Sequence, residues 1–295
     1  MQKKKVFAAL TIIVICAAVL GGLYALASFL VTGAQPLSGT FGKSIAIVEV
    51  KGLIADSEEV IKEIKKYRDD SGVAAVVLRV DSPGGVVAPS QEIYEEVKKL
   101  SVMKPVVVSM GSVAASGGYY VSCGADYIMA NPGTTTGSIG VIIQMMNFEG
   151  AADTIGIEGI VIKSGDLKDV GNPFRTMTDT ERRFLQEYVD SLQEQFLSVV
   201  MEGRGLKRED VERISDGRIL TGEQALELGL VDELGNMEDA IKKAAELVGI
   251  DGDPNVIYPP EERITVFDLM IRESAREISD MIVLGTFRAE YRLAP

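Results

Sequence analysis

The chain is organised around the stretch Val106-Val-Val-Ser-Met-Gly-Ser-Val-Ala-Ala-Ser-Gly-Gly-Tyr-Tyr120. Its β-branched start predicts a buried strand, and the small residues that follow predict a sharp junction between that strand and a short helix. A serine at such a junction, here Ser116, exposes its hydroxyl at the end of a sheet, next to the unpaired amides of the first helical turn. This geometry suits a nucleophile beside an oxyanion hole, although small residues at this place also let a helix pack closely on a sheet.

The sequence on both sides alternates apolar runs with amphipathic segments. The apolar runs predict strands at residues 44–50, 73–80, 106–110, 127–130 and 157–163. Amphipathic patterns predict helices at residues 56–69, 90–100, 116–124, 178–201 and 236–248, with a further short helix opened by residues 220–223. Thr178-Asp-Thr-Glu181 is a capping-box pattern at the start of the longest of them. Strands that alternate with helices of this length predict βαβ units and parallel pairing, so the expected fold class is α/β.

The N-terminal region predicts a membrane segment. Residues 6–32 carry no charged side chain and follow Lys3-Lys-Lys5. Such a run is long enough to cross the roughly 30 Å hydrocarbon core of a bilayer as a helix. We expect a signal anchor, retained or cleaved, with residues 1–5 in the cytoplasm and the rest of the chain beyond the membrane. Residues 33–43 then read as a linker, residues 44–250 as the globular domain, and residues 251–295 as a C-terminal extension with a helical pattern.

Composition excludes several kinds of chemistry. The 295 residues include no histidine, which rules out a Ser-His-Asp triad, a Cys-His dyad and a histidine-ligated zinc ion. The two cysteines, Cys16 and Cys123, lie in different segments and do not make a disulfide framework. The net charge of -13 makes nucleic acid an unsuitable partner. A serine nucleophile in this chain must therefore take its base from lysine, aspartate, glutamate or a less usual group.

Three loops of small residues follow predicted strands and are expected to meet at one edge of a parallel sheet, where ligands bind. They are residues 81–85, 111–118 and 134–140. The amide of Gly85, together with that of Ser116 or Gly117, is a candidate oxyanion hole, since glycine lets a backbone approach a substrate closely. A tight turn at Pro83-Gly-Gly85 explains the same residues without any function.

Two lysines just after the last predicted strand are candidate bases. A buried lysine loses its proton more readily than an exposed one, and a neutral lysine can deprotonate a serine. The pattern of residues alone does not choose between Lys163 and Lys168. Ser138 is a candidate for the hydroxyl that orients the lysine, although a serine between glycines is more often a turn residue.

Five motifs occur in an order that resembles a known family. They are Asp81-Ser-Pro-Gly-Gly85, Ser109-Met-Gly-Ser-Val-Ala-Ala-Ser-Gly-Gly-Tyr-Tyr120, Ala130-Asn-Pro-Gly-Thr-Thr-Thr-Gly-Ser-Ile-Gly140, Ile162-Lys-Ser-Gly-Asp-Leu-Lys168, and Asp216-Gly-Arg218 followed by Leu230-Val-Asp-Glu-Leu-Gly235. Together they resemble the signal peptide peptidase SppA family, of the short bacterial and archaeal type, within the ClpP/crotonase-like fold. The resemblance covers residues 44–248, and the absence of histidine agrees with it independently.

The resemblance implies a role for each matched residue. Ser116 stands where the family has its nucleophile, and Lys168 stands where it has its general base. Ser138 matches the serine that binds that lysine, and Gly85, with the Gly117 region, matches the oxyanion amides. In the family the serine and the lysine meet across an interface, which implies a ring-like homo-oligomer. It also implies a membrane-anchored endopeptidase that needs no metal or organic cofactor and acts on signal peptide remnants or other exposed apolar segments.

Other functions fit parts of the same pattern. A membrane-bound protease of this fold that acts on stomatin-like partners would share the serine and the lysine. A non-catalytic membrane scaffold would keep the fold and the oligomer, but an intact Ser116 and Lys168 argue against it. A coenzyme A-binding crotonase is disfavoured because the domain is expected outside the cytoplasm. Cys123, close to the proposed nucleophile, is interpreted as a small core residue.

Overall fold

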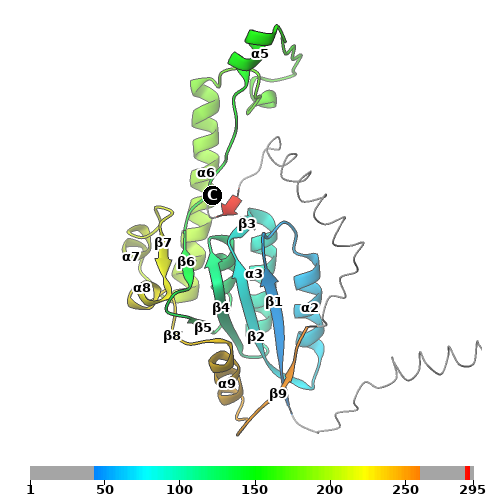
Figure 1. Ribbon diagram of the computed structural model, residues 1–295, viewed down its shortest axis with the longest axis vertical. Helices are drawn as coiled ribbons and strands as arrows, with labels where there is room; N and C mark the ends of the chain where they lie inside the picture. The colour runs from blue at the N-terminus through cyan, green and yellow to red at the C-terminus, as the bar shows by residue number, and fades with distance from the viewer. Residues whose placement is uncertain (1–42, 260–289, 293–295) are drawn as a thin grey trace, which may run out of the picture. The chain divides into compact units, whose positions relative to one another are not determined.

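A mostly parallel sheet forms the centre of the protein (Figure 1). The computed structural model describes residues 43–259 and 290–292. The strands of its eight-stranded sheet are β1 (Ser44–Lys51), β2 (Val73–Ser82), β4 (Val106–Ala115), β5 (Tyr127–Ala130), β6 (Thr135–Gly137), β7 (Ile219–Thr221), β8 (Glu233–Leu234) and β9 (Asn255–Ile257). The path through the sheet runs β7-β6-β4-β2-β1-β9, and every pair except β6 with β7 is parallel. The predicted α/β fold class with parallel strands is confirmed.

Two short strands lie apart from this sheet and pair with each other. They are β3 (Gly84–Val86) and β10 (Glu290–Arg292), which run antiparallel. More than 200 residues of sequence separate them, and the pairing therefore brings the C-terminal region to the loop that follows β2.

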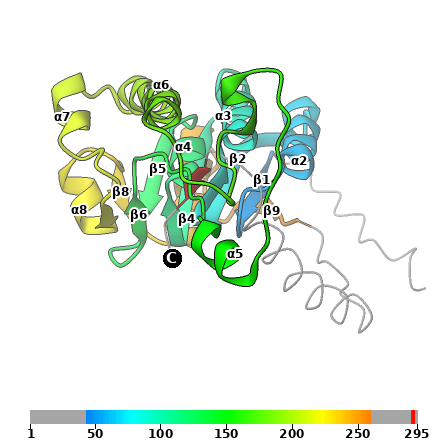
Figure 2. The same ribbon diagram turned by 90° about the horizontal axis from the view of Figure 1, so that it is seen from above.

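Helices cover both faces of the sheet. They are α2 (Glu58–Asp69), α3 (Val87–Ser101), α4 (Gly117–Ser122), α5 (Glu149–Ile155), α6 (Asp179–Arg204), α7 (Arg208–Glu212), α8 (Gly222–Glu227) and α9 (Met237–Leu247), with a 3-10 turn, η1 (Asp166–Asp169). Successive side chains of a strand point to opposite faces. Ala46 and Val48 of β1 accordingly pack with α2, α3, α4 and α6, which Figure 2 shows on one side of the sheet, whereas Ile45 and Ile47 pack with α9.

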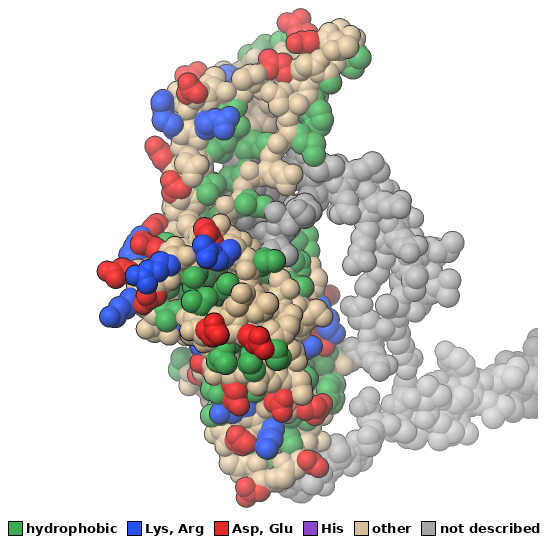
Figure 3. Space-filling model, turned by 60° about the vertical axis from the view of Figure 1, so that its left-hand side comes forward, with side chains coloured by type: hydrophobic (Ala, Val, Ile, Leu, Met, Phe, Trp, Pro, Cys, Tyr) green, Lys and Arg blue, Asp and Glu red, His purple; other side chains and the backbone are tan. Residues whose placement is uncertain are grey.

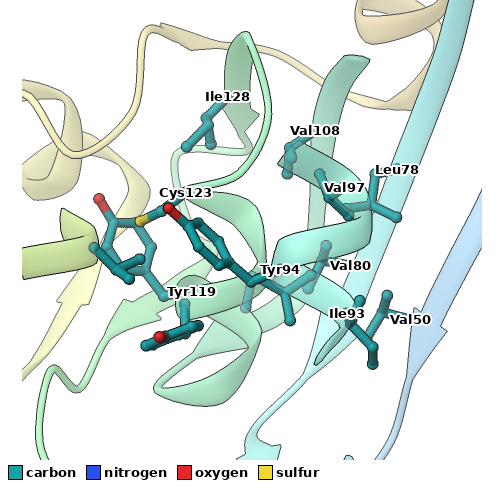
Figure 4. Close-up of a cluster of buried hydrophobic side chains, with 14 of the residues drawn as sticks. Val50, Leu78, Val80, Ile93, Tyr94, Val97, Val108, Tyr119, Cys123 and Ile128 are labelled. Atoms are coloured by element: carbon teal, nitrogen blue, oxygen red, sulfur yellow. The ribbon is translucent and has the colours of Figure 1, made fainter. Parts of the chain in front are cut away.

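Each face of the sheet has its own hydrophobic core, and the side chains of α4 lie in the larger one, which α2, α3 and α6 also cover. Figure 4 shows Tyr119 and Cys123 close together among side chains from β2, β4 and β5. The Tyr119 hydroxyl donates a hydrogen bond of 2.9 Å to the Leu230 carbonyl. Burial raises the pKa of the Cys123 thiol to about 12, which agrees with its interpretation as a core residue. A helix anchored in this way gives Ser116, the residue before it, a rigid support.

Three helices of the C-terminal half begin with reciprocal side-chain caps, whereas α7 does not. The predicted capping box at the start of α6 is confirmed, with Thr178 and Glu181 exchanging backbone and side-chain hydrogen bonds. The same reciprocal arrangement opens α8, through Thr221 and Gln224, and α9, through Asn236 and Asp239. The residues before α2, α3 and α4 make no such side-chain bond.

The segment between β6 and α6 differs most from expectation. Residues 157–163, predicted as a strand, form neither strand nor helix, so that prediction is wrong. Ile160 is 83% exposed and Ile162 is 97% exposed, because no neighbouring strand pairs with this apolar run and no helix covers it. Residues 134–140, predicted as a turn, contain β6, and α5 was not predicted.

The predicted membrane segment, residues 6–32, lies outside the described residues, as do the cytoplasmic stub and nearly all of the linker. None of the helices that the structure describes is long and apolar enough to span a bilayer. Most of the C-terminal extension also lies outside the described part, although β9 joins the sheet beside β1.

Candidate active site

The end of β4 leaves the regular sheet register. Up to Met110 this strand pairs with β2 in step, but Ala114 pairs with Ser82, so two extra residues are accommodated. The first half of β4 pairs with β5, and its last three residues pair with β6. The carboxylate of Asp81 holds the displaced segment by accepting a 3.1 Å hydrogen bond from the Val113 amide. This shift places the residue after β4, Ser116, at the edge of the sheet next to the end of β6.

Ser116 combines a strained backbone with an unpaired hydroxyl. Its backbone angles are φ 53° and ψ -115°, a strained combination for a residue with a Cβ. Strain of this kind costs about 1–3 kcal/mol and persists where the surrounding structure enforces it, often at functional sites. The Ser116 hydroxyl is buried, so the prediction that it is exposed at the end of the sheet is wrong, and it has no hydrogen-bond partner among the described residues. A buried, unpaired hydroxyl is unfavourable for stability, so a catalytic use is the simpler explanation of its position.

Ser138 lies next to Ser116 at the end of the neighbouring strand. Ala115 of β4 is in register with Gly137 of β6, and the Ser116 amide donates to the Gly137 carbonyl at 2.8 Å. The two serines therefore follow paired residues at the carboxyl ends of adjacent parallel strands. Ser138 has φ 50°, is 6% exposed, and donates its amide to the Arg218 carbonyl at 2.8 Å. Among the described residues, only these two have a positive φ without being glycine.

Gly85 presents its backbone polar groups to the side of β3 that faces away from Ile54. The Ile54 amide bonds to the Gly84 carbonyl at 2.9 Å, and the Val86 amide bonds to the Ile54 carbonyl at 2.8 Å. Since backbone polar groups alternate in direction along a strand, the Gly85 amide and carbonyl point away from Ile54. On that side the backbone of Tyr291 in β10 pairs with Gly85 in antiparallel register. This edge therefore accepts an extended peptide backbone.

Close packing also explains why this position is glycine. A Cβ on Gly85 would lie 2.1 Å from the Ile54 carbonyl oxygen. A Cβ on Gly118, in the first turn of α4, would lie 2.8 Å from the Ser82 carbonyl oxygen. These approaches bring the start of α4 up to the end of β2. The Ser116 and Gly117 amides are the two candidates for the second donor of the oxyanion hole. The Ser116 amide already bonds to the Gly137 carbonyl, which leaves the Gly117 amide for this role beside Gly85.

The structure does not bring either candidate base to the serines. Lys168 lies on η1 and is exposed. It belongs to the segment of residues 141–178, here called the arm, which carries α5 away from the sheet (Figure 1). Its backbone amide donates to the Gly165 carbonyl at 3.1 Å, but the side-chain ammonium makes no hydrogen bond or ion pair within the described part of the chain. Lys163, in contrast, pairs with the Asp169 carboxylate at 2.6 Å and donates to the Asp166 carbonyl at 2.9 Å. The two lysines, equivalent in the sequence, thus have different surroundings.

An ionic cluster that the sequence did not predict joins the arm to the start of α6. Arg175 bonds to the carboxylates of both Asp169 and Glu181. Hydrogen bonds from Arg175, and then from Lys163, hold the pKa of Asp169 well below its usual range. Hydrogen bonds from Arg175, and then from the Thr178 amide, lower the pKa of Glu181 to about 2. The only sequence signal for this cluster was the capping-box position of Glu181.

The arm exposes an unusual number of large apolar side chains. Figure 3 shows hydrophobic side chains over the upper part of the molecule, where the arm and the start of α6 lie. They include Met146, Phe148, Ile155, Ile157, Ile160, Val161, Ile162, Leu167, Phe174, Phe184 and Tyr188. Apolar surface gathered in this way usually marks a contact with another molecule.

Comparison with known proteins identifies the family of the chain. The sequence profile of peptidase family S49 matches residues 98–251, which include both serines and both lysines. A Synechocystis protein provisionally named a protease is 46% identical over 220 residues, which cover 74% of this chain and 79% of that protein. An Enterococcus faecium protein provisionally named signal peptide peptidase SppA is 39% identical over 217 residues, 69% of this chain and 63% of that protein. Protease 4 of Haemophilus influenzae is 32% identical over 254 residues, 81% of this chain but 41% of that protein. The chain therefore belongs to peptidase family S49, the family of signal peptide peptidase SppA, and is a serine peptidase.

Proposed function

We propose that the protein is a membrane-anchored serine endopeptidase that uses a Ser-Lys dyad on a ClpP/crotonase-like fold. The observation that carries this proposal is the state of Ser116: a strained backbone, and a buried hydroxyl without a partner among the described residues. Beside it lies the β3 edge, which pairs with an extended segment of the chain itself. A nucleophile next to a place for an extended peptide backbone is what an endopeptidase requires.

Lys168 serves as the general base and reaches Ser116 of a neighbouring copy. The lysine is exposed on an arm that also exposes large apolar side chains. One contact between copies would bury the lysine and these apolar side chains together. Burial matters chemically, because a lysine removes a proton from serine only when desolvation disfavours its ammonium form. In a closed ring, the same head-to-tail interface repeats between all neighbouring copies. A ring-like homo-oligomer would therefore bury every arm and bring a lysine to every Ser116.

In the proposed reaction the Ser116 oxygen attacks the carbonyl carbon of the scissile peptide bond and gives its proton to Lys168. The Gly85 and Gly117 amides stabilise the negative oxygen of the tetrahedral intermediate. Lys168 then passes the proton to the departing amine, and the C–N bond breaks to leave an acyl group on Ser116. A water molecule, deprotonated by Lys168, releases the acyl group and restores the serine. Ser138, one strand away from Ser116, orients the lysine through its hydroxyl.

The proposed substrates are remnant signal peptides or other apolar segments exposed at the membrane. The charge-free residues 6–32 support an anchor that keeps the protein there, with residues 1–5 in the cytoplasm and the peptidase domain on the opposite side. The name of the Enterococcus relative assigns signal peptide peptidase activity to that protein, which supports the same substrate class for this chain.

A complementation experiment tests both the dyad and the shared site. We expect S116A and K168A to abolish cleavage of an unfolded apolar protein by the full-length protein in detergent, whereas K163A should at most reduce it and not abolish it. All variants should assemble to the same size. Co-assembly of S116A with K168A subunits should restore about a quarter of the wild-type activity, because a quarter of the interfaces then join an intact serine to an intact lysine. A lysine acting within its own copy would give no restoration. A wild-type assembly that cleaves nothing, and whose Ser116 resists phosphonylating reagents, would point to a scaffold.

A further inference from the structure

The turn that carries Lys168 has little apolar support of its own. None of the residues of η1 is buried. Hydrophobic packing therefore does not fix the position of Lys168 relative to the rest of the domain. Hydrogen bonds and ion pairs must supply whatever order this turn has.

Arg175 connects the turn to α6 through both ends of its guanidinium group. Its Nε donates to Asp169 Oδ2 at 2.9 Å, and its Nη2 donates to the Asp169 carbonyl at 3.2 Å. Its Nη1 donates to Glu181 Oε2 at 2.9 Å, and Nη2 also bonds to Glu181 Oε1. A planar fork that binds two carboxylates fixes direction as well as distance.

The far end of this connection is firmly anchored. Glu181 lies in the first turn of α6, is 3% exposed, and forms the capping box with Thr178. The same helix buries Phe196 and Val200 in the main core. A continuous set of contacts thus runs from the core along α6 to Glu181, through Arg175, to Asp169, the residue next to Lys168.

Lys163 completes the arrangement from the other side. It occupies Asp169 Oδ1 at 2.6 Å, while Arg175 occupies Oδ2. Both oxygens of Asp169 are therefore engaged by cations other than Lys168. The carboxylate next to the base in sequence holds the turn and does not itself bind the base.

We propose that Arg175 and Asp169 are positioning residues of the peptidase, which hold the Lys168 turn on the start of α6 so that the lysine arrives at Ser116 of a neighbouring copy in the geometry needed for proton transfer. This inference rests on the proposed role of Lys168. Lys163 contributes to the same purpose as a partner of Asp169, which explains why two lysines occur close together where one base is needed.

Arg175→Met in the full-length protein is the direct test, with Arg208→Met as its matched control. Arg208 also joins two carboxylates, those of Glu194 and Glu212, but it lies on α7 and not on the arm. We expect R175M to lower kcat about 10- to 100-fold with KM changed less than about threefold, since a displacement on the order of 1 Å has a rate effect of this size. R175K, which keeps the charge but not the fork, should lie between R175M and wild type. R208M should match wild type.

A second readout separates positioning from general damage. The rate at which a phosphonylating reagent labels Ser116 should fall in both R175M and K168A, and the double variant should be no slower than K168A alone. Two groups that act through one step are non-additive in this way, whereas independent damage adds. If R175M fails to assemble, D169N provides the same comparison, because it keeps the side-chain shape and an oxygen acceptor.

The outcomes distinguish this inference from the proposed function. Wild-type kcat in R175M and D169N, equal losses in R175M and R208M, or an additive double variant would each overturn the positioning role. A K168A variant that keeps wild-type kcat would instead overturn the role of Lys168 itself.

Discussion

Replacement of Gly85 by alanine should damage stability and catalysis through two separate causes. A methyl group at this position would lie 2.1 Å from the Ile54 carbonyl oxygen, and 2.7 Å from its carbonyl carbon and amide nitrogen. All of these are backbone atoms, so no side chain can rotate away. Gly85 does not have a positive φ, and its backbone angles therefore give no separate reason to exclude alanine.

The expected loss of stability follows from the contacts that must break. To reach an ordinary contact distance, β3 has to move away from Ile54, which strains the 2.9 Å and 2.8 Å hydrogen bonds that join them. Two such bonds contribute about 1 kcal/mol each. Residual overpacking adds about 1–3 kcal/mol. The free energy of unfolding should thus fall by about 3–5 kcal/mol, which lowers Tm by roughly 6–20 °C in a domain of this size.

The expected loss of activity is larger than stability alone explains. If the Gly85 amide binds the oxyanion, its displacement should lower kcat about 10²- to 10³-fold in molecules that remain folded. Calorimetry and a peptidase assay, with active sites counted by phosphonylation, measure the two effects separately.

Two other glycines provide the controls. Gly222→Ala would place a Cβ 2.0 Å from the Asn131 carbonyl oxygen, a similar clash at the start of α8, whereas Gly133 has no atom within 4 Å of such a Cβ. We expect G222A to lose stability but keep kcat, and G133A to resemble wild type. The close-approach argument is refuted if G85A melts like G133A. The oxyanion assignment is refuted if kcat falls no further in G85A than in G222A.

Three further predictions follow from single residues. S138G should raise Tm by an amount equivalent to about 1 kcal/mol, because glycine tolerates a φ of 50° without strain. The same variant should lower kcat, because it loses the hydroxyl. A Tm that does not rise contradicts the strain argument. In a C16S background, Cys123 should resist thiol reagents at pH 8 until the protein is unfolded, because burial raises its pKa to about 12; rapid labelling of the folded protein would show that it is accessible. Since hydrogen bonds from Arg175, and then from the Thr178 amide, lower the pKa of Glu181 to about 2 from its usual 4.5, its carboxylate stabilises the fold above pH 4.5, and that stabilisation is lost as pH falls toward 2. The Tm of wild type should therefore fall more steeply than that of E181Q over this interval, and parallel curves would exclude the pairing.

The central strands could be predicted because burial on both faces leaves a simple pattern. β1, β2, β4 and β5 are mainly apolar, and the first three are rich in valine or isoleucine, as parallel strands between two layers of helices require. Residues 157–163 have the same composition, but their apolar side chains are exposed on the arm. An apolar run shows that the side chains of a segment favour burial. It does not show whether a strand, a helix or another molecule buries them.

The closeness of Ser116 and Ser138 could be predicted from sequence, and their relation to the lysines could not. Both serines lie in loops of small residues that a parallel topology brings to one edge of the sheet. Lys163 and Lys168 have the same immediate context, and only the ion pair with Asp169 separates them. Arg175 bonds to residues six positions away on either side, a spacing that no helical or strand periodicity indicates.

The pairing of β3 with β10 could not be predicted either. Each strand has only three residues, and β10 consists of Glu290-Tyr-Arg292, which carries no apolar run. The pairing uses the Gly85 backbone groups that face away from Ile54. Backbone groups leave no pattern of side chains from which the pairing could be predicted.

The difference between helix starts has a consequence for the order in which the chain folds. The start points of α6, α8 and α9 are set by residues three positions apart, so their first hydrogen bonds need no contact with any distant segment. The helices α2, α3 and α4 have no side-chain cap at their starts, and the sheet must define where they begin. During synthesis α2, α3 and α4 emerge first but have to wait for their strands to pair, whereas α6, α8 and α9 can nucleate as soon as their own first turn is complete.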